Sequence, residues 1–351
     1  MAHILVVGGA GQQGRIVARE LSIRHHVTVL DMVDPELVDV QWNKCQMWNS
    51  PTNSYNGLFK RYDVVVNCTP ATIGTVVQVQ CLWAGVPCID LAFVEEDLRK
   101  RHHQFREVGG LLVPDCGLSP GLSNLAIGYD LNSTKAKKLD YAEVYVGGVA
   151  KDSSRPYGYV ATWALEDLEQ EYHRVARYVD NGEIRTLHPL HSPREEYGDF
   201  EAFPSDGLRT LLDWKDKVCY MIEYTLRWPG HVEQIHKLID EGRFVTELQE
   251  QCSKGEDMVV LDVITSEAAW SLVDYAKDGV SAMARTTAFS CAAFTEAYLE
   301  LQHTKLMGVI PPEELAAFPG FVDSVLFYLE ERGINFERKK EKNAKKETSI
   351  P

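Results

Sequence analysis

The chain has 351 residues and a formal net charge of −15, with 45% hydrophobic and 25% charged residues. This length fits two domains, and the composition is typical of a globular protein. The negative charge argues against general binding to nucleic acid or to an anionic membrane, because both need a basic surface.

Eight cysteines are scattered along the chain without a C-x-x-C pair or a His/Cys ligand spacing. This distribution argues against both a metal site and a disulfide framework. No apolar stretch is long enough to span a bilayer, and the first predicted strand begins almost at residue 1. We therefore expect no metal, no membrane partner and a cytoplasmic location.

Residues 3–14 predict a strand, a glycine-rich turn and the start of a helix. The apolar run 4–7 is short and β-branched, as in a strand buried on both faces, and residues 15–21 have helical spacing. The glycines between them follow G-x-G-x-x-G, which lets a backbone approach a pyrophosphate at a helix N-terminus. The expected cofactor contacts in this turn are Gly9, Gly11, Gln12, Gln13 and Gly14.

A second predicted strand, residues 27–30, ends in Asp31, where the ribose-binding acid of a dinucleotide site belongs. A carboxylate there accepts hydrogen bonds from the ribose 2′-hydroxyl and repels a 2′-phosphate. The neighbouring Met32 and Val33 supply no cation. These residues predict NAD rather than NADP as the cofactor.

Further predicted strands at 62–68, 87–91 and 110–114 alternate with predicted helices at 75–84 and 95–108. This alternation is typical of a doubly wound parallel sheet, the Rossmann arrangement. Polar residues near the carboxyl ends of such strands face the cofactor crevice. We expect Asn67, Thr69, Pro70 and Asp90 there.

Residues 115–124 break this alternation. Ser119 followed by Pro120 predicts a helix start, with the serine as cap. Asp115 and Asn124 belong to this segment, which follows a parallel strand and should face the crevice. Asn124 is a candidate for binding substrate or nicotinamide. Asp115 is a candidate catalytic residue, or alternatively fixes the turn through backbone N–H groups.

From residue 140 the pattern changes to alternating strands, turns and aromatic residues, with helices expected at 166–178 and 231–239. We expect a second α+β domain built on a mixed sheet. The predicted division is 1–125 for the Rossmann domain, 126–283 for the substrate and oligomerisation domain, 284–335 for helices returning to the first domain, and 337–351 for a disordered tail.

Several motifs then resemble the saccharopine dehydrogenase-like superfamily, and within it most closely the lysine 6-dehydrogenases. They are DCGLSPGLSN (115–124), YVGGV (145–149), WALEDL (163–168), EY (171–172), EAF (201–203), SDGLR (205–209), LRWPGH (226–231) and GVIPPEEL (308–315). The resemblance implies a Rossmann domain with an inserted substrate domain, a small amino-acid substrate, and a homodimer or higher homo-oligomer.

The implied reaction is NAD-dependent oxidation of the terminal amine of L-lysine to the 6-semialdehyde, which cyclises, with release of ammonia. Such a substrate needs a guanidinium for its carboxylate and an acid for its ammonium. Arg209 and Arg227 are candidates for the first role. Glu201 and Asp206 are candidates for the second, or anchor those arginines.

His231 suits a proton shuttle, but equally suits a helix cap. Tyr159 and Trp163 are candidates for the wall around the aliphatic stem of lysine, although aromatic residues at such spacing also build cores. Two other functions fit the same cofactor motif. One is a saccharopine- or carboxynorspermidine-type reductase that joins an amine and an aldehyde, and the other is a non-catalytic NADH sensor.

Overall fold

The computed structural model describes residues 1–340 except 34–40, 45–55, 163–164, 193–194 and 302–303. The chain forms two compact units, each assembled from two stretches of sequence. Unit 1 comprises Met1–Gly128 and Thr287–Arg332, and unit 2 comprises Tyr129–Thr286 and the described residues after Arg332. The sequence places these divisions after residues 125 and 283, whereas the two compact units divide after Gly128 and Thr286.

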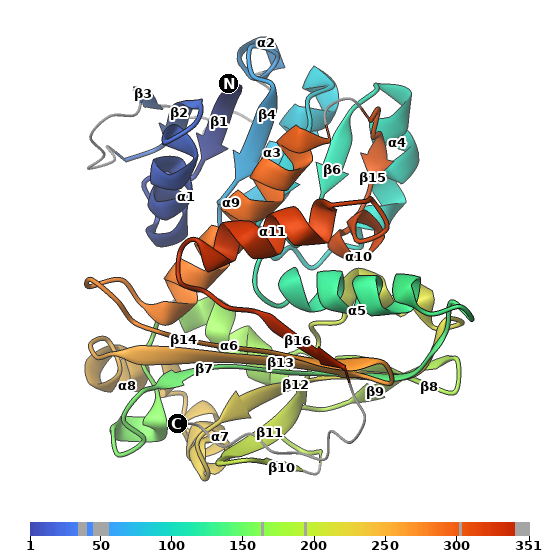
Figure 1. The fold of residues 1–351 in the computed structure, drawn as a ribbon. Helices are drawn as coiled ribbons and strands as arrows, with labels where there is room; N and C mark the ends of the chain where they lie inside the picture. The colour runs from blue at the N-terminus through green and yellow to red at the C-terminus, as the bar shows by residue number, and fades with distance from the viewer. Residues whose placement is uncertain (34–40, 45–55, 163–164, 193–194, 302–303, 341–351) are drawn as a thin grey trace. The chain divides into compact units, whose positions relative to one another are not determined.

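Unit 1 is built on a sheet of seven parallel strands in the order β15-β6-β5-β4-β1-β2-β3 (Figure 1). This is the Rossmann strand order with one further strand, β15, beside β6, and it confirms the predicted doubly wound sheet. The strands are β1 (His3–Val7), β2 (His26–Asp31), β3 (Gln41–Lys44), β4 (Val64–Asn67), β5 (Cys88–Asp90), β6 (Leu111–Val113) and β15 (Gly308–Val309).

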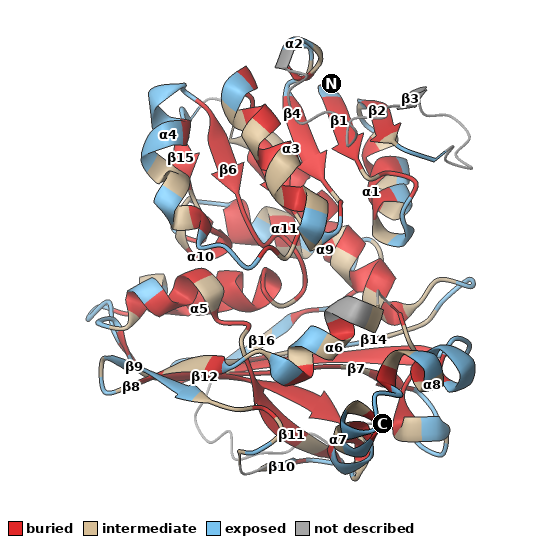
Figure 2. Cartoon of the chain, turned by 180° about the vertical axis from the view of Figure 1, so that it is seen from behind, coloured by how far each residue is buried: buried red, intermediate tan, exposed pale blue. Residues whose placement is uncertain are grey.

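The central strands are buried along almost their whole length, as Figure 2 shows in red. Their valines and isoleucines are buried, as in strands that are covered on both faces, and this burial favours strands at these short apolar runs. The helices that lie wholly in unit 1 are α1 (Gln12–Ser22), α2 (Asn56–Phe59), α3 (Ala71–Ala84), α4 (His102–Glu107), α10 (Pro312–Leu315) and α11 (Phe321–Glu330). Two helices, α5 (Leu122–Ser133) and α9 (Ala282–Glu300), pass from one unit to the other.

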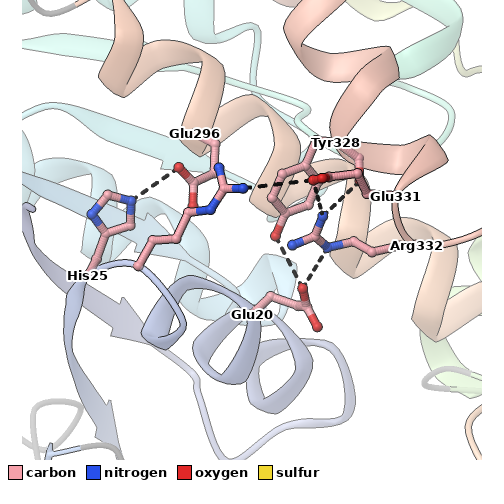
Figure 3. Close-up of polar contacts among 7 residues, drawn as sticks. Glu20, His25, Glu296, Tyr328, Glu331 and Arg332 are labelled. Atoms are coloured by element: carbon pink, nitrogen blue, oxygen red, sulfur yellow. Dashed lines mark hydrogen bonds and ion pairs between the residues drawn. The ribbon is translucent and has the colours of Figure 1, made fainter.

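The C-terminal helices are tied to α1 by polar contacts (Figure 3). Arg332, directly after α11, donates from Nε to Glu20 of α1 at 2.6 Å, and Tyr328 donates to the same carboxylate at 3.4 Å. His25 Nε2 lies 3.1 Å from Glu296 of α9. These contacts fix the helix whose N-terminus carries the glycine-rich turn.

Unit 2 is built on a nine-stranded mixed sheet. Its main path is β10-β11-β12-β7-β13-β14-β16, and β8 pairs with both β12 and β9. The β12–β7 pair is parallel and the other pairs are antiparallel. The strands are β7 (Leu139–Ala150), β8 (Ala176–Asp180), β9 (Glu183–Leu187), β10 (Glu195–Tyr197), β11 (Phe200–Ser205), β12 (Val218–Arg227), β13 (Asp257–Thr265), β14 (Ala268–Tyr275) and β16 (Glu337–Lys340). The prediction of a mixed sheet is confirmed.

Helices α6 (Leu165–His173), α7 (His231–Asp240) and α8 (Phe244–Gln251) bury apolar side chains in a cluster with Phe203 of β11. The predicted helix 166–178 is too long, because α6 ends at His173. Its second part is β8, where Ala176 and Val179 are buried against the sheet.

Two other local predictions are wrong. Helix α5 begins at Leu122 rather than after Ser119, because Gly121 has a φ of 137° that cannot continue into the helix. Residues 337–340, expected in the disordered tail, form β16 and pair with β14. Arg338 stabilises this strand by donating to the buried Asp130 at 2.8 Å. Residues 341–351 lie outside the described residues.

No helix in the described part of the chain is long and apolar enough to cross a membrane. The described residues also contain no group of three or more His, Cys, Asp or Glu side chains placed to hold a metal ion. The homo-oligomer expected from the sequence stays a prediction.

Candidate functional site

The glycine-rich turn of unit 1 connects β1 to α1 through very close backbone contacts. A Cβ on Gly14 would lie 2.2 Å from the carbonyl oxygen of Gly8, and a Cβ on Gly9 would lie 2.6 Å from Val29. Gly11 is the N-cap of α1 and provides no side-chain cap, and Gln12 and Gln13 form its first turn. Their amide groups have no intrahelical partners, so the turn provides N–H donors of the kind that bind phosphate.

Asp31 lies at the end of β2, directly beside this turn. Its Oδ2 accepts from the amide of Ala10 at 2.8 Å, and its Oδ1 accepts from the amide of Met32 at 2.7 Å. The carboxylate is half-buried. The structure thus brings the predicted ribose acid to the predicted phosphate turn.

The strand register gathers further polar residues at the same edge of the sheet. Val7 pairs with both Leu30 and Asn67, and Asn67 pairs with Asp90. The carboxyl ends of β1, β2, β4 and β5 therefore lie side by side. Ligands of open α/β sheets bind at this edge.

Asn67 and Asp90 are fully buried and contact each other at this edge. Asn67 Nδ2 donates to Asp90 Oδ1 at 2.7 Å, while its Oδ1 accepts from the hydroxyl of Thr69 at 2.7 Å. Pro70 follows as the N-cap of α3. Burial, together with the nearby charge of Asp115, raises the pKa of Asp90 to about 7 although Gln78 and other donors oppose the shift.

Asp115 and Asn124 also lie in unit 1. Asp115 follows β6 with a φ of 57°, and it is almost completely buried. Asn124 Oδ1 accepts from the amide of Gly121 at 3.3 Å, and its Nδ2 donates to Glu313 at 3.3 Å. Asn124 therefore connects α5 with α10, and its side chain is fully buried.

In unit 2 the structure brings together Arg227, Tyr159 and His231. The guanidinium carbon of Arg227 lies 5.2 Å from the ring centre of Tyr159, and this ring lies 5.7 Å from that of His231. All three side chains are buried. Trp163 lies outside the described residues.

Two residues of α6 complete this group. Glu171 accepts from Arg227 Nη2 at 3.0 Å and from the hydroxyl of Thr225 at 2.7 Å. Tyr172 lies between Arg227 Nε, at 3.4 Å, and His231 Nε2, at 2.7 Å. Burial opposes the charge of Arg227, but Tyr172 and Glu171 hold its pKa above the ordinary value.

The hydrogen bonds of His231 fix its tautomer. Its Nδ1 lies 2.6 Å from the carbonyl oxygen of Tyr157, which can only accept, so Nδ1 carries the proton. Nε2 then accepts from the hydroxyl of Tyr172. Burial and then the charge of Arg227 lower the pKa of His231 to about 3. The imidazole is therefore neutral near pH 7.

The two candidate acids of unit 2 have protein partners. Glu201 accepts from the amides of Gly230 at 3.1 Å and Val232 at 2.7 Å, so its charge stabilises the N-terminus of α7. Asp206 forms a two-bond ion pair with Arg177 of β8, at 2.8 and 2.9 Å. Arg209 is half-buried and has a φ of 53° at the start of a short 3₁₀-helix.

Glu171, Tyr172 and Thr225 were not among the residues singled out as site candidates, although the first two belong to a quoted motif. A buried arginine requires a nearby acid, and this requirement was the available signal. The sequence alone does not show which acid it is, because the partner lies 56 residues away.

Comparison with known proteins places these features in context. Residues 117–334, more than half of the chain, match the family described as "Saccharopine dehydrogenase C-terminal domain". Apo saccharopine dehydrogenase (L-Glu forming) from Saccharomyces cerevisiae has a TM-score of 0.76 at 18% identity, covering 97% of this chain and 100% of that chain. This similarity shows a shared fold. DAP dehydrogenase from C. glutamicum in complex with DAP has a TM-score of 0.46 at 12% identity, covering 94% of this chain and 98% of that chain. This TM-score is too low to establish a shared fold.

Proposed function

Since the chain belongs to the saccharopine dehydrogenase family, we propose that it is an NAD-dependent oxidoreductase that deaminates the terminal amine of L-lysine. The product is the 6-semialdehyde, which cyclises, and ammonia is released. The observation that carries the proposal is the combination of a glycine turn with Asp31 in unit 1 and the family match over residues 117–334.

The residues of the turn fit a dinucleotide. Gly9 and Gly14 leave no room for side chains against Val29 and Gly8, so helix α1 packs closely on the turn, and the amide groups at its N-terminus are available for a diphosphate. Asp31, bonded to the same turn, is the proposed acceptor for the ribose hydroxyl groups. NAD, when bound, accepts a hydride from the carbon that carries the amine. Asp31 and the absence of a cation at Met32 and Val33 support NAD over NADP.

In unit 2, Arg209 and Arg227 are both proposed as candidates for the substrate carboxylate, because each lies in a motif that resembles the family. Arg227 pairs with Glu171 in the core, and Arg209 is half-buried in the SDGLR segment. Glu201 accepts hydrogen bonds at the N-terminus of α7, and Asp206 forms an ion pair with Arg177. We therefore do not assign the substrate ammonium to either acid. His231 is a positioning residue in this proposal, because both its nitrogens bind protein groups.

The amine must lose a proton before hydride leaves, because an ammonium has no lone pair. We assign this proton to Asp115, at the carboxyl end of β6, where ligands of parallel sheets bind. Asp115→Asn is expected to lower kcat at least about a hundredfold, in the range of general-base loss. An unchanged kcat would reject this role.

A second candidate is a reductase that joins an amine and an aldehyde. The similarity in fold to a saccharopine dehydrogenase favours it. The deciding assay is absorbance of NADH with purified protein at mildly alkaline pH. NADH formation from NAD and L-lysine supports the deaminase. NADH consumption only when an amine and an aldehyde are both present supports the reductase. Binding of NADH without turnover of any amine indicates a sensor.

A further inference from the structure

We propose that Arg15 is a cofactor-positioning residue whose guanidinium binds the diphosphate of the dinucleotide. The inference deepens the cofactor site and rests on the proposed function. Arg15 lies in the first turn of α1, directly after the last glycine of the turn, and its side chain is exposed. The sequence motif gave it no role.

The guanidinium of Arg15 is held over the glycine-rich turn. Its Nη2 donates to the carbonyl oxygen of Ala10 at 2.9 Å. The amide of the same residue, Ala10, donates to Asp31 at 2.8 Å. A cation and the ribose acid are thus anchored to one residue of the turn, so Arg15 is close to where the phosphates next to that ribose must lie.

The charge of Arg15 is unfavourable in the protein alone. A helix N-terminus favours acids by about 0.3–1 kcal/mol and disfavours cations, yet the first turn of α1 contains no acid and no side-chain cap. Among the described residues, Arg15 forms no ion pair with a carboxylate. The helix dipole, the free amide groups and the guanidinium therefore all favour an anion at the N-terminus of α1. A diphosphate supplies two negative charges there.

One bond of Arg15 to Ala10 uses only one of the five N–H donors of a guanidinium. In the described part of the chain no other bond of the guanidinium is found, so the remaining donors can form a paired contact with phosphate oxygens. A lysine has the charge but not this planar pair of donors. This difference gives the test a graded series of variants.

The test measures dissociation constants of NADH and NADPH by fluorescence titration for the wild type, Arg15→Ala, Arg15→Lys and Arg19→Ala. Arg19 is the control, because it is an exposed arginine one turn later on the same helix. We expect Arg15→Ala to raise both dissociation constants about tenfold, equivalent to about 1.4 kcal/mol, and to weaken their salt dependence. Arg15→Lys should recover part of the loss, and Arg19→Ala should bind like the wild type.

Unchanged NADH binding in Arg15→Ala would overturn the proposal. A loss confined to NADPH would also overturn it, because the contact would then be to the 2′-phosphate. These outcomes are separate from the failure of the proposed function. If the wild type binds NADH but turns over no amine, the proposed reaction fails while the role of Arg15 stands. If the wild type binds neither nucleotide, both fail.

Discussion

At the scale of single residues, burial decides what His231 can do. Its two nitrogens are bonded to Tyr157 and Tyr172, and its pKa lies near 3. A histidine on a surface would titrate near 6.5 and could carry protons at neutral pH. Here the imidazole stays neutral and orients the hydroxyl of Tyr172, which in turn accepts from Arg227.

This low pKa predicts a specific acid sensitivity. In the unfolded chain His231 takes up a proton near pH 6.5, whereas in the folded chain its pKa is about 3. The group therefore lowers the free energy of unfolding as pH falls through this window, by up to about 1.4 kcal/mol per pH unit. His231→Gln keeps an acceptor for Tyr172 but has no such titration. Urea unfolding between pH 7 and 4 should give a shallower slope for the variant, and identical slopes would contradict the account.

At the scale of elements, local patterns were predictable and long-range pairs were not. The valine-rich strands β1 and β4 were predictable because burial on both faces requires apolar residues at every position. The glycine turn and Asp31 were predictable because their spacing is set by one β-turn-α-β unit. In contrast, β16 consists of charged residues, and its order depends on pairing with β14 and on Asp130, which is 208 positions away.

The Arg338–Asp130 contact predicts how β16 contributes to stability. Asp130 is completely buried, and two further donors, Thr265 and Trp270, accompany Arg338. Arg338→Met removes the only cation among these three contacts and should lower the free energy of unfolding by about 2–3 kcal/mol. Lys339→Met is the matched control on the same strand, because Lys339 is 76% exposed and should change stability by less than about 0.5 kcal/mol. Equal melting temperatures for the two variants would show that β16 is not held by this pair.

At the scale of the whole molecule, the order of the chain explains why the site could be only partly predicted. Unit 1 takes its sheet mainly from the N-terminal stretch and its last helix, α11, from the C-terminal stretch. The cofactor residues are close in sequence and recognisable by motif. The network of Glu171, Tyr172, Arg227 and His231 assembles only when α6, β12 and α7 pack together. Sequence motifs indicated the family, while the individual contacts required the fold.

The fate of the substrate nitrogen distinguishes oxidative deamination from a reaction that joins an amine and an aldehyde. L-lysine labelled with ¹⁵N at its side-chain amine would be incubated with the protein and NAD, and labelled ammonium would be measured by NMR against NADH formed. We expect one ¹⁵N-ammonium for each NADH, because hydrolysis of the imine releases the nitrogen. NADH formation without labelled ammonium, or label retained in a secondary amine, would contradict oxidative deamination and support the amine-joining chemistry instead.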